Sequence, residues 1–560
     1  MVLFMRISLS KGGSFFAVNR GALDSAYPAV WYLVFACVAL CSYTLSFRYG
    51  IDLDDEGLLI GGAADILGGR YPLADFYSYQ PWMYFSLAGF FRLFDTTLLV
   101  ERLFLIVNLM AAGLCLLWLA RQVLPPFLAM LPVLLYALAP GPWYKVFFIF
   151  HLLLIVVTLF VFDSRPQPQR AMLAGLAAGF ALVSRVEAGL VGIVLFVGTL
   201  GLSVIADLYA PSRRNPRMVA RHVANVTSYA LCAAIPLAAF AAVYASVGKL
   251  RPLVDHLRYY ATTEPYENVV DLTGRTDAFS LSALFTHPAL EHWFYGLSLL
   301  ACLTLFLINV ASFFRSGENA PVETRRLIIL AATSLASMGY TLFFVWNSRM
   351  LSSFAIVYVA EIALLFQLQR SFGAKHGHLL PVAGGICLVF VVHTFCKVNF
   401  YSGSIQMRVL APGRSNAPFL KGATIDASQA VAIDKLRAIA TRDPGATLVP
   451  MSEATTMGFL SGLPNPTYYR LFTVELFGRR RQETAIETIE RHKIKYFVAR
   501  SGQFIAGGAP ASDIDKFAPL MKKYLVSHYD IQSLSHTYVL LTRRVADQRG
   551  APADRSSTVQ

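Results

Sequence analysis

Residues 26–47, AYPAVWYLVFACVALCSYTLSF, form an apolar run that is followed closely by Asp52-Leu53-Asp54-Asp55-Glu56-Gly57. The run is long enough to cross a bilayer, which takes about 20 residues of helix. Four carboxylates within five residues at the end of a membrane helix are costly unless something pairs or uses them. The two segments together predict a membrane protein with a functional site at one of its surfaces.

Apolar runs recur through the first 400 residues, and the chain as a whole is 56% hydrophobic and 15% charged, with a mean hydropathy of +0.53. We predict spans near 28–46, 99–120, 124–140, 143–162, 188–208, 224–247, 293–314, 327–346, 351–369 and 379–398. Shorter runs at 80–94 and 171–183 are expected to be half-length, tilted or broken helices. Because backbone in hydrocarbon must satisfy its own hydrogen bonds, the predicted fold is a polytopic α-helical membrane protein of about 11–12 helices.

Lys and Arg in the short loops predict the orientation. Basic residues mark one set of loops as cytoplasmic: Arg6, Lys11, Arg20, Arg165, Arg170, Arg213, Arg214, Arg217, Arg221, Arg315, Arg325, Arg326, Arg370 and Lys375. The acidic loop 48–80, the loop 248–292 and the C-terminal region are then external. This orientation needs an odd number of spans between Gln80 and Ser164, so the short run 80–94, interrupted by Arg92, is expected not to span.

We therefore expect a multi-pass protein of the bacterial inner (plasma) membrane with its active site and C-terminal domain in the periplasm. The predicted organisation is a cytoplasmic arm (1–25), a transmembrane module (26–399), an exported α/β domain (400–545) and a flexible tail (546–560). In the exported domain, helices near 426–440, 481–492 and 512–524 alternate with short β runs at 446–450, 496–500, 529–534 and 537–541.

Composition argues against a nucleic-acid-binding protein and against an exported domain held by disulfides. The net charge of +14 is explained by cytoplasmic loops and lipid headgroups, so nucleic-acid binding is not supported. The seven cysteines all fall in apolar segments, so no disulfide framework is expected in the exported domain.

The acid cluster precedes a short amphipathic helix at Leu58–Leu67, which ends at Gly68-Gly69. One acid, Asp54 or Asp55, would suffice to cap this helix. Several adjacent acids repel one another, so the cluster is interpreted as functional. The aromatic band Phe76–Tyr84 beyond it suits a membrane interface or a sugar face.

A second candidate site is Ser184-Arg185-Val186-Glu187, which interrupts two apolar stretches and returns to the external side. Arg185 and Glu187 either neutralise each other at a helix break or bind an anionic headgroup. Lys145 and Arg349 are further candidates for meeting a phosphate on the same side.

Several of these residues carry a family resemblance. Asp54-Asp55-Glu56-Gly57, followed by Tyr71-Pro72, Asp75-Phe76 and Gln80-Pro81, resembles the first external loop of polyprenyl-phosphate-sugar-dependent membrane glycosyltransferases of the C fold class. Relatives in that class include protein O-mannosyltransferases, lipid A aminoarabinose transferases and rhizobial galacturonosyltransferases. Where the family has a second proline at the end of the motif, this chain has Trp82.

The resemblance implies an inverting glycosyltransferase that moves a sugar from a polyprenyl-phosphate donor to a hydroxyl of a lipid, glycan or protein acceptor. It implies Asp55 as general base, with Glu56 and Asp54 beside it. Arg185, Lys145 and Arg349 would hold the donor phosphate, and Asp75, Tyr77, Gln80 and Glu187 would contact substrate.

No cofactor is required by this pattern, and a divalent cation on Asp54 and Asp55 is left open. The alternative function is a polytopic transporter or lipid-linked-sugar flippase that uses the acidic loop for cations or protons. A polymerase or ligase of lipid-linked glycans would share the fold and differ in its acceptor.

Overall fold

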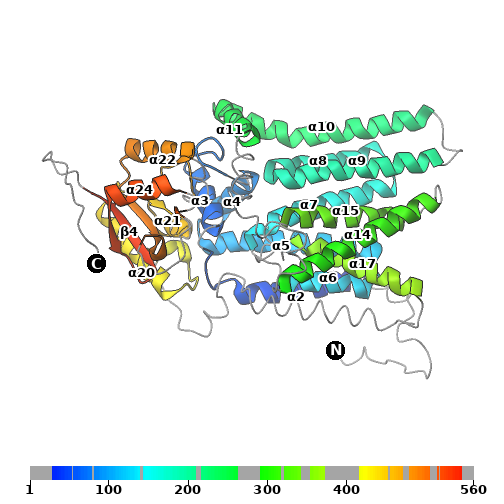
Figure 1. Cartoon of the computed structure of the whole chain (residues 1–560), viewed down its shortest axis with the longest axis horizontal. Helices are drawn as coiled ribbons and strands as arrows, with labels where there is room; N and C mark the ends of the chain where they lie inside the picture. Colours follow the sequence, from blue (N-terminus) through cyan, green and yellow to red (C-terminus); the bar gives the residue numbers. More distant parts are fainter. Residues whose placement is uncertain are drawn as a thin grey trace, which may run out of the picture.

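The computed structural model describes residues 28–52, 55–78, 81–138, 143–209, 216–262, 290–316, 321–341, 353–372, 415, 417–451, 454–470, 479–504, 514–515 and 518–544. These residues form a helical bundle and a small α/β domain, and a set of short elements at one end of the bundle joins the two (Figure 1). The chain is a polytopic helical membrane protein with a small C-terminal α/β domain, as the sequence predicts.

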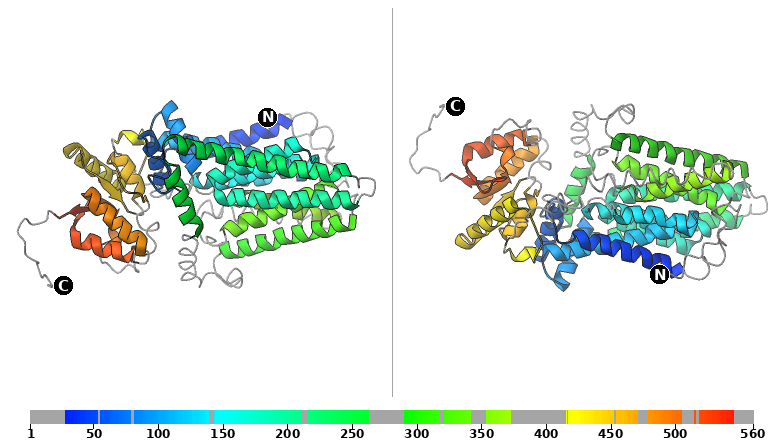
Figure 2. Two further views of the ribbon diagram at one scale, coloured as in Figure 1. Left: turned by 90° about the horizontal axis from the view of Figure 1, so that it is seen from above. Right: turned by 90° about the horizontal axis from the view of Figure 1, so that it is seen from below.

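The bundle consists of long helices that run side by side (Figures 1 and 2). Among the described residues they are α2 (Pro28–Ser46), α5 (Leu98–Val123), α6 (Pro126–Leu138), α7 (Val146–Ser164), α8 (Pro168–Ser184), α9 (Val186–Tyr209), α10 (Pro216–Ser246), α14 (Leu290–Ser316), α15 (Val322–Thr341) and α17 (Ala355–Phe372). Five of these helices, namely α5, α7, α9, α10 and α14, are long and apolar enough to cross a membrane. The predicted span 379–398 lies outside the described residues.

The two short apolar runs form helices of different length and position. The run 171–183 is α8, a full member of the bundle, whereas the run 80–94 is the 13-residue helix α4 (Pro81–Leu93). Helix α4 packs against α3 (Asp55–Leu67) at the end of the bundle that faces the C-terminal domain (Figure 1). Three bundle helices, α5, α6 and α7, therefore separate the acidic loop from the basic loop at Ser164, which is the odd number that the charge pattern requires.

The two ends of the bundle differ in charge. The helix ends that carry Arg165, Arg170, Arg221, Arg315 and Arg325 lie far from the C-terminal domain (Figure 1). The acidic first loop and α11 (Leu250–Thr262) lie at the end next to that domain. The loops predicted to be cytoplasmic and external thus lie at opposite ends of the bundle, and which end faces the cytoplasm stays a prediction.

Helices α8 and α10 approach each other through glycines. A Cβ atom at Gly175 would overlap the carbonyl oxygen of Tyr229, and one at Gly179 would overlap that of Ala233. Small residues spaced four apart let membrane helices pack backbone to backbone, since lipid offers no hydrophobic drive to hold them together. This contact fixes α8, and with it the helix break at Arg185.

The C-terminal domain has a four-stranded sheet with the order β1-β2-β4-β3. Strand β1 (Leu448–Pro450) is parallel to β2 (Tyr496–Arg500), and β4 (Tyr538–Arg543) is antiparallel to both β2 and β3 (Tyr529–Ser533). The helical elements are η7 (Pro418–Leu420), α20 (Ala427–Arg442), α21 (Thr455–Ser461), α22 (Arg479–His492), η8 (Ser501–Gln503) and α24 (Pro519–His528).

One side of this sheet is covered by α22 and α24. Phe497 and Leu541 of the sheet pack there with Ile489, Met521 and Leu525 in a fully buried core. Helix α20 begins with a capping box in which Asp426 accepts a hydrogen bond from the Ser428 amide. The alternation of helices and short strands predicted from the sequence is confirmed. The last predicted helix corresponds to α24, with residues 514–515 before it also helical, and residues 511–513 and 516–517 lie outside the described residues.

Gly175→Ala is expected to destabilise the bundle by about 1–3 kcal/mol, because the added methyl group forces α8 away from α10. The measurement is the thermal unfolding midpoint in detergent. Gly198→Ala on α9 is the matched control, since a Cβ atom there meets nothing within 4 Å. Equal midpoints for the two variants would contradict the close packing of α8 on α10.

Candidate active site

The acidic loop is organised around a buried ion pair. Arg102, in the first turns of α5, donates from Nε to Glu56 Oε1 at 2.7 Å and from Nη2 to Glu56 Oε2 at 3.2 Å. Both side chains have 0% of their surface exposed. Arg102 also donates to the backbone carbonyl oxygens of Phe47 and Gly50. A single guanidinium thus joins the end of α2, the loop and the start of α3.

Among the described residues, Asp52 caps the start of α3. Asp52 Oδ1 accepts from the amides of Asp55, at 2.7 Å, and Glu56, at 3.4 Å. The Asp52 amide in turn donates to Glu56 Oε2 at 2.9 Å. These reciprocal bonds satisfy two of the free N–H groups at the start of α3. The side chain of Asp55 is half-buried at the N-terminus of α3, and Asp54 lies outside the described residues.

The C-terminal domain closes over this loop. Thr456 Oγ1, at the start of α21, donates to the backbone carbonyl of Asp52 at 2.6 Å. Gly57 lies so close to Thr456 that a Cβ atom on it would overlap the Thr456 backbone. A backbone bridge between Gly50 and Thr424 ties the other side of the loop to the same domain. The acidic loop is therefore enclosed between the bundle and the C-terminal domain.

Two further acids of the first loop serve this junction. Asp65 forms ion pairs with Arg70 at 3.0 Å and with Arg470 of the C-terminal domain. Asp75 Oδ2 accepts from the Tyr71 amide at 2.6 Å and pairs with Lys249, next to α11. Asp75, predicted to contact substrate, thus has a turn amide and a lysine as partners in this structure.

Tyr77 lies inside an aromatic cluster at the same junction. Its ring centroid is 5.7 Å from that of His256 on α11 and 6.4 Å from those of Tyr468 and Tyr469. Only 3% of Tyr77 is exposed. His256 Nδ1 and Tyr468 Oη share a hydrogen bond of 2.6 Å. This cluster joins the first loop, α11 and the C-terminal domain, so Tyr77 contributes to packing there.

Arg185 stands at the break between α8 and α9, where its backbone is extended. The side chain is buried, donates to Tyr340 Oη, and has its Nε 3.8 Å from a carboxylate oxygen of the half-exposed Glu187. Tyr340 stacks on Phe148 with ring centroids 3.9 Å apart. The Arg185–Glu187 pair that the sequence suggested is therefore present but long, and Tyr340 is a second partner.

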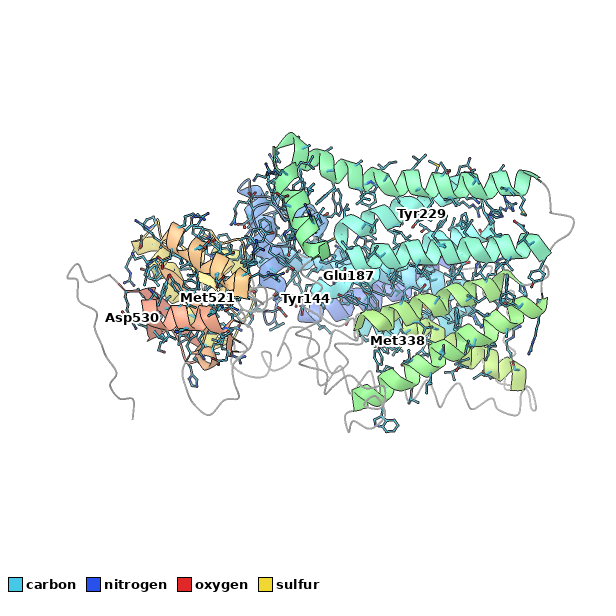
Figure 3. The ribbon with its side chains drawn as sticks, turned by 45° about the horizontal axis from the view of Figure 1, so that its top comes forward. Tyr144, Glu187, Tyr229, Met338, Met521 and Asp530 are labelled. Carbon is cyan, nitrogen blue, oxygen red and sulfur yellow. The ribbon has the colours of Figure 1, made fainter. Side chains whose placement is uncertain are left out.

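Arg185 and the acidic loop belong to the same end of the bundle. The short helix η1 (Trp143–Lys145) contacts α3 and α5 and leads directly into α7, which carries Phe148. Tyr144 and Glu187 both lie at the end of the bundle that faces the C-terminal domain (Figure 3). Lys145 belongs to η1, whereas Gln80 and Arg349 lie outside the described residues.

No group of three or more His, Cys, Asp or Glu side chains suited to a metal ion occurs among the residues that the structure describes. Asp54 is not among those residues, so the structure does not test the divalent cation that the sequence leaves open on Asp54 and Asp55.

Sequence reasoning missed Arg102, Thr456 and the capping role of Asp52. A signal for Arg102 was present, since Glu101-Arg102 places two charges inside an otherwise apolar run. Charged residues within a span usually pair with a partner inside the protein. Thr456 had no such signal, because its contact with Asp52 joins residues 404 positions apart.

Neither a protein-family model nor a curated protein sequence matches the chain. Among solved structures, it is similar to ArnT from Cupriavidus metallidurans bound to undecaprenyl phosphate, at 13% identity and a TM-score of 0.48, over 94% of this chain and 100% of that one. It is also similar to the oligosaccharyltransferase of Archaeoglobus fulgidus, at 14% identity and a TM-score of 0.47, over 90% of this chain and 74% of that one. At these TM-scores the likeness does not decide the activity of this chain.

Arg102→Ala is expected to lower the stability of the bundle by about 3–5 kcal/mol, because it leaves the carboxylate of Glu56 buried without its partner. The double variant Arg102→Leu/Glu56→Leu removes both charges and is expected to recover part of that loss. Thermal unfolding of the two variants in detergent measures the difference. A double variant no more stable than Arg102→Ala would argue against the ion pair as the organising contact.

The junction is expected to weaken in acid through His256. Burial, and to a lesser degree Arg481, lowers the pKa of His256 from 6.5 to about 4. Between these values the unfolded chain binds a proton that the folded chain does not, so up to about 3 kcal/mol of stability is lost as the pH falls from about 6.5 to about 4. Unfolding midpoints measured across this range should fall less steeply for His256→Phe. If the unfolding midpoints of the variant and the parent fell equally with pH, His256 would not be the cause of the lower stability in acid.

Proposed function

We propose that this chain is a membrane glycosyltransferase that moves a sugar from a polyprenyl-phosphate donor to an acceptor hydroxyl at the end of the bundle facing the C-terminal domain. The observation that carries the proposal is the half-buried carboxylate of Asp55. It sits on a loop held by the buried Arg102–Glu56 pair and covered by α21. An acid whose neighbours in the chain are held in this way is suited to be a catalytic group, because general-base catalysis depends on geometry first.

The described acids of the cluster, Asp52, Asp55 and Glu56, have different proposed roles. Glu56 is fully buried against Arg102 and Asp52 caps α3, which makes both of them positioning residues. Asp55 is then our choice of general base. It accepts the proton of the acceptor hydroxyl as the hydroxyl oxygen attacks the anomeric carbon. The bond from that carbon to the donor phosphate breaks, and the electron pair leaves with the phosphate, so the anomeric configuration inverts.

The departing phosphate needs a cation, and Arg185 is our first choice. Its guanidinium is buried at the helix break on the same end of the bundle, where a low dielectric strengthens its attraction for a phosphate. Binding a phosphate there requires Arg185 to exchange or share its contact with Tyr340. Glu187, Lys145 and Arg349 remain proposed members of the donor site, as Asp54 and Gln80 remain proposed members of the acidic loop.

For Asp75 and Tyr77, which the sequence predicted to contact substrate, we now propose a structural role. Because their contacts are with Lys249, Tyr71 and the aromatic cluster, we assign them to shaping the junction.

Asp55→Asn is expected to reduce sugar transfer by at least about a hundredfold, since the amide cannot take the proton. The assay uses purified protein in vesicles with a labelled polyprenyl-phosphate sugar and membrane extract as the acceptor source. Asp530→Asn is the matched control. It makes the same change on an exposed strand of the C-terminal domain, far from the bundle (Figure 3).

Full transfer by Asp55→Asn would remove the general-base assignment. The transporter reading is tested in the same vesicles, because it predicts movement of the labelled lipid between leaflets with no new glycosidic bond. Transport without transfer in the parent protein would therefore overturn the enzyme proposal as a whole.

Arg185→Ala is expected to raise the donor KM and to lower kcat by about tenfold or more, because the leaving phosphate loses its cation. Tyr340→Phe keeps the ring that stacks on Phe148 and removes only the hydroxyl that accepts from Arg185. It should leave transfer largely intact. If the donor KM and kcat of Arg185→Ala equalled those of the parent, Arg185 would have a structural role only.

A further inference from the structure

Helix α11 leaves the bundle at a sharp corner. Helix α10 ends in a Schellman motif, in which the Gly248 amide donates to the Ala245 carbonyl and the Lys249 amide to that of Tyr244. Gly248 has a φ of 70°, a conformation that glycine adopts without strain. Beyond this corner α11 runs across the end of the bundle instead of along it (Figure 2).

The corner falls at the expected edge of the bilayer. The last strongly polar residue in the first part of α10 is Asn225, and residues 226–247 that follow it are predominantly apolar. At about 1.5 Å per residue this part is about 33 Å long, close to the roughly 30 Å of a hydrocarbon core. Gly248 and the start of α11 therefore lie at the level of the lipid headgroups.

One face of α11 exposes an apolar stripe. Leu250, Val254 and Leu257 follow the spacing i, i+4, i+7 and are between 38% and 52% exposed. Val243 near the end of α10 and Val247 in the turn before α11 are exposed as well. Spacing of this kind places the three side chains on one side of the helix.

The stripe is not the face by which α11 packs on the protein. That face carries Leu253, which is buried with Phe240 and Tyr244 of α10, and His256, which bonds to Tyr468. A helix with one face on the protein and a second, apolar face in the open needs another apolar environment for the second face.

Basic residues flank the stripe. Arg251 and Arg258 are exposed on the same edge of α11, each about one turn from Val254, and Arg258 directly follows Leu257. Arg251 lies 3.9 Å from Asp255, in a pair that solvent reaches freely. Apolar side chains beside arginines are the pattern of helices that lie in a membrane interface and attract anionic headgroups.

We propose that α11 is a membrane-surface anchor, with Leu250, Val254 and Leu257 in the outer part of the acyl region and Arg251 and Arg258 among anionic headgroups. The anchor does not depend on the reaction proposed above. It has a consequence for the junction, since α11 carries His256 and directly follows Lys249, the partner of Asp75. Lipid contact then fixes the height above the bilayer at which the first loop and the C-terminal domain meet.

The test places a tryptophan on the stripe of the full-length protein in vesicles. Val254→Trp is compared with Asp255→Trp, which lies on the adjacent, exposed edge, and the emission of the parent protein is subtracted. Lipids brominated near the headgroup end of the acyl chain should quench the added tryptophan at position 254 at least about twofold more than the one at position 255. Leu257→Trp repeats the measurement in case the first variant does not fold.

The basic flank is tested in the same vesicles. Quenching of Val254→Trp should increase when phosphatidylglycerol replaces about a third of the phosphatidylcholine, and Arg251→Gln/Arg258→Gln should abolish that increase. Equal quenching at positions 254 and 255 would overturn the anchor. So would a tryptophan at 254 that neither brominated lipid nor acrylamide reaches, because protein, from this chain or a second copy, would then cover the stripe.

Discussion

The ion pair between Arg102 and Glu56 is the contact on which the arrangement of this site depends. Two fully buried charges are tolerated only when they pair and their remaining hydrogen-bonding groups are satisfied. Here Arg102 satisfies its other N–H groups on the carbonyls of Phe47 and Gly50, and Glu56 accepts from the Asp52 amide. These bonds tie residues 47–52, which follow α2, to the first turn of α3. The position of Asp55 follows from them, one residue before Glu56.

The C-terminal domain completes this arrangement from outside the bundle. Thr456 contacts the loop at Asp52, while Arg470 reaches Asp65 and lies 4.8 Å above the ring of Phe76. Arg70 returns the contact by donating to the carbonyls of Asn465 and Thr467. Both the C-terminal domain and the first loop contribute side chains to these contacts. We therefore regard the C-terminal domain as a structural part of the site.

The sequence predicted the bundle and the sheet well because both follow from local patterns. Apolar length and basic loops identify spans, and the failure of 80–94 to span was visible in its length and in Arg92. The site was harder. A cluster of acids looks alike in sequence whether its members cap a helix, pair with a buried arginine or face a substrate. Only the fold distinguishes Asp52, Glu56 and Asp55, since Arg102 approaches from 46 residues away.

The most direct test of the account is to locate the phosphate of a bound polyprenyl phosphate by cryo-electron microscopy of the protein in a lipid nanodisc. We expect the phosphate at the break between α8 and α9, in contact with the Arg185 guanidinium, with room for an acceptor hydroxyl beside Asp55. A phosphate held at the opposite end of the bundle, among the ends that carry Arg165 and Arg325, would contradict it.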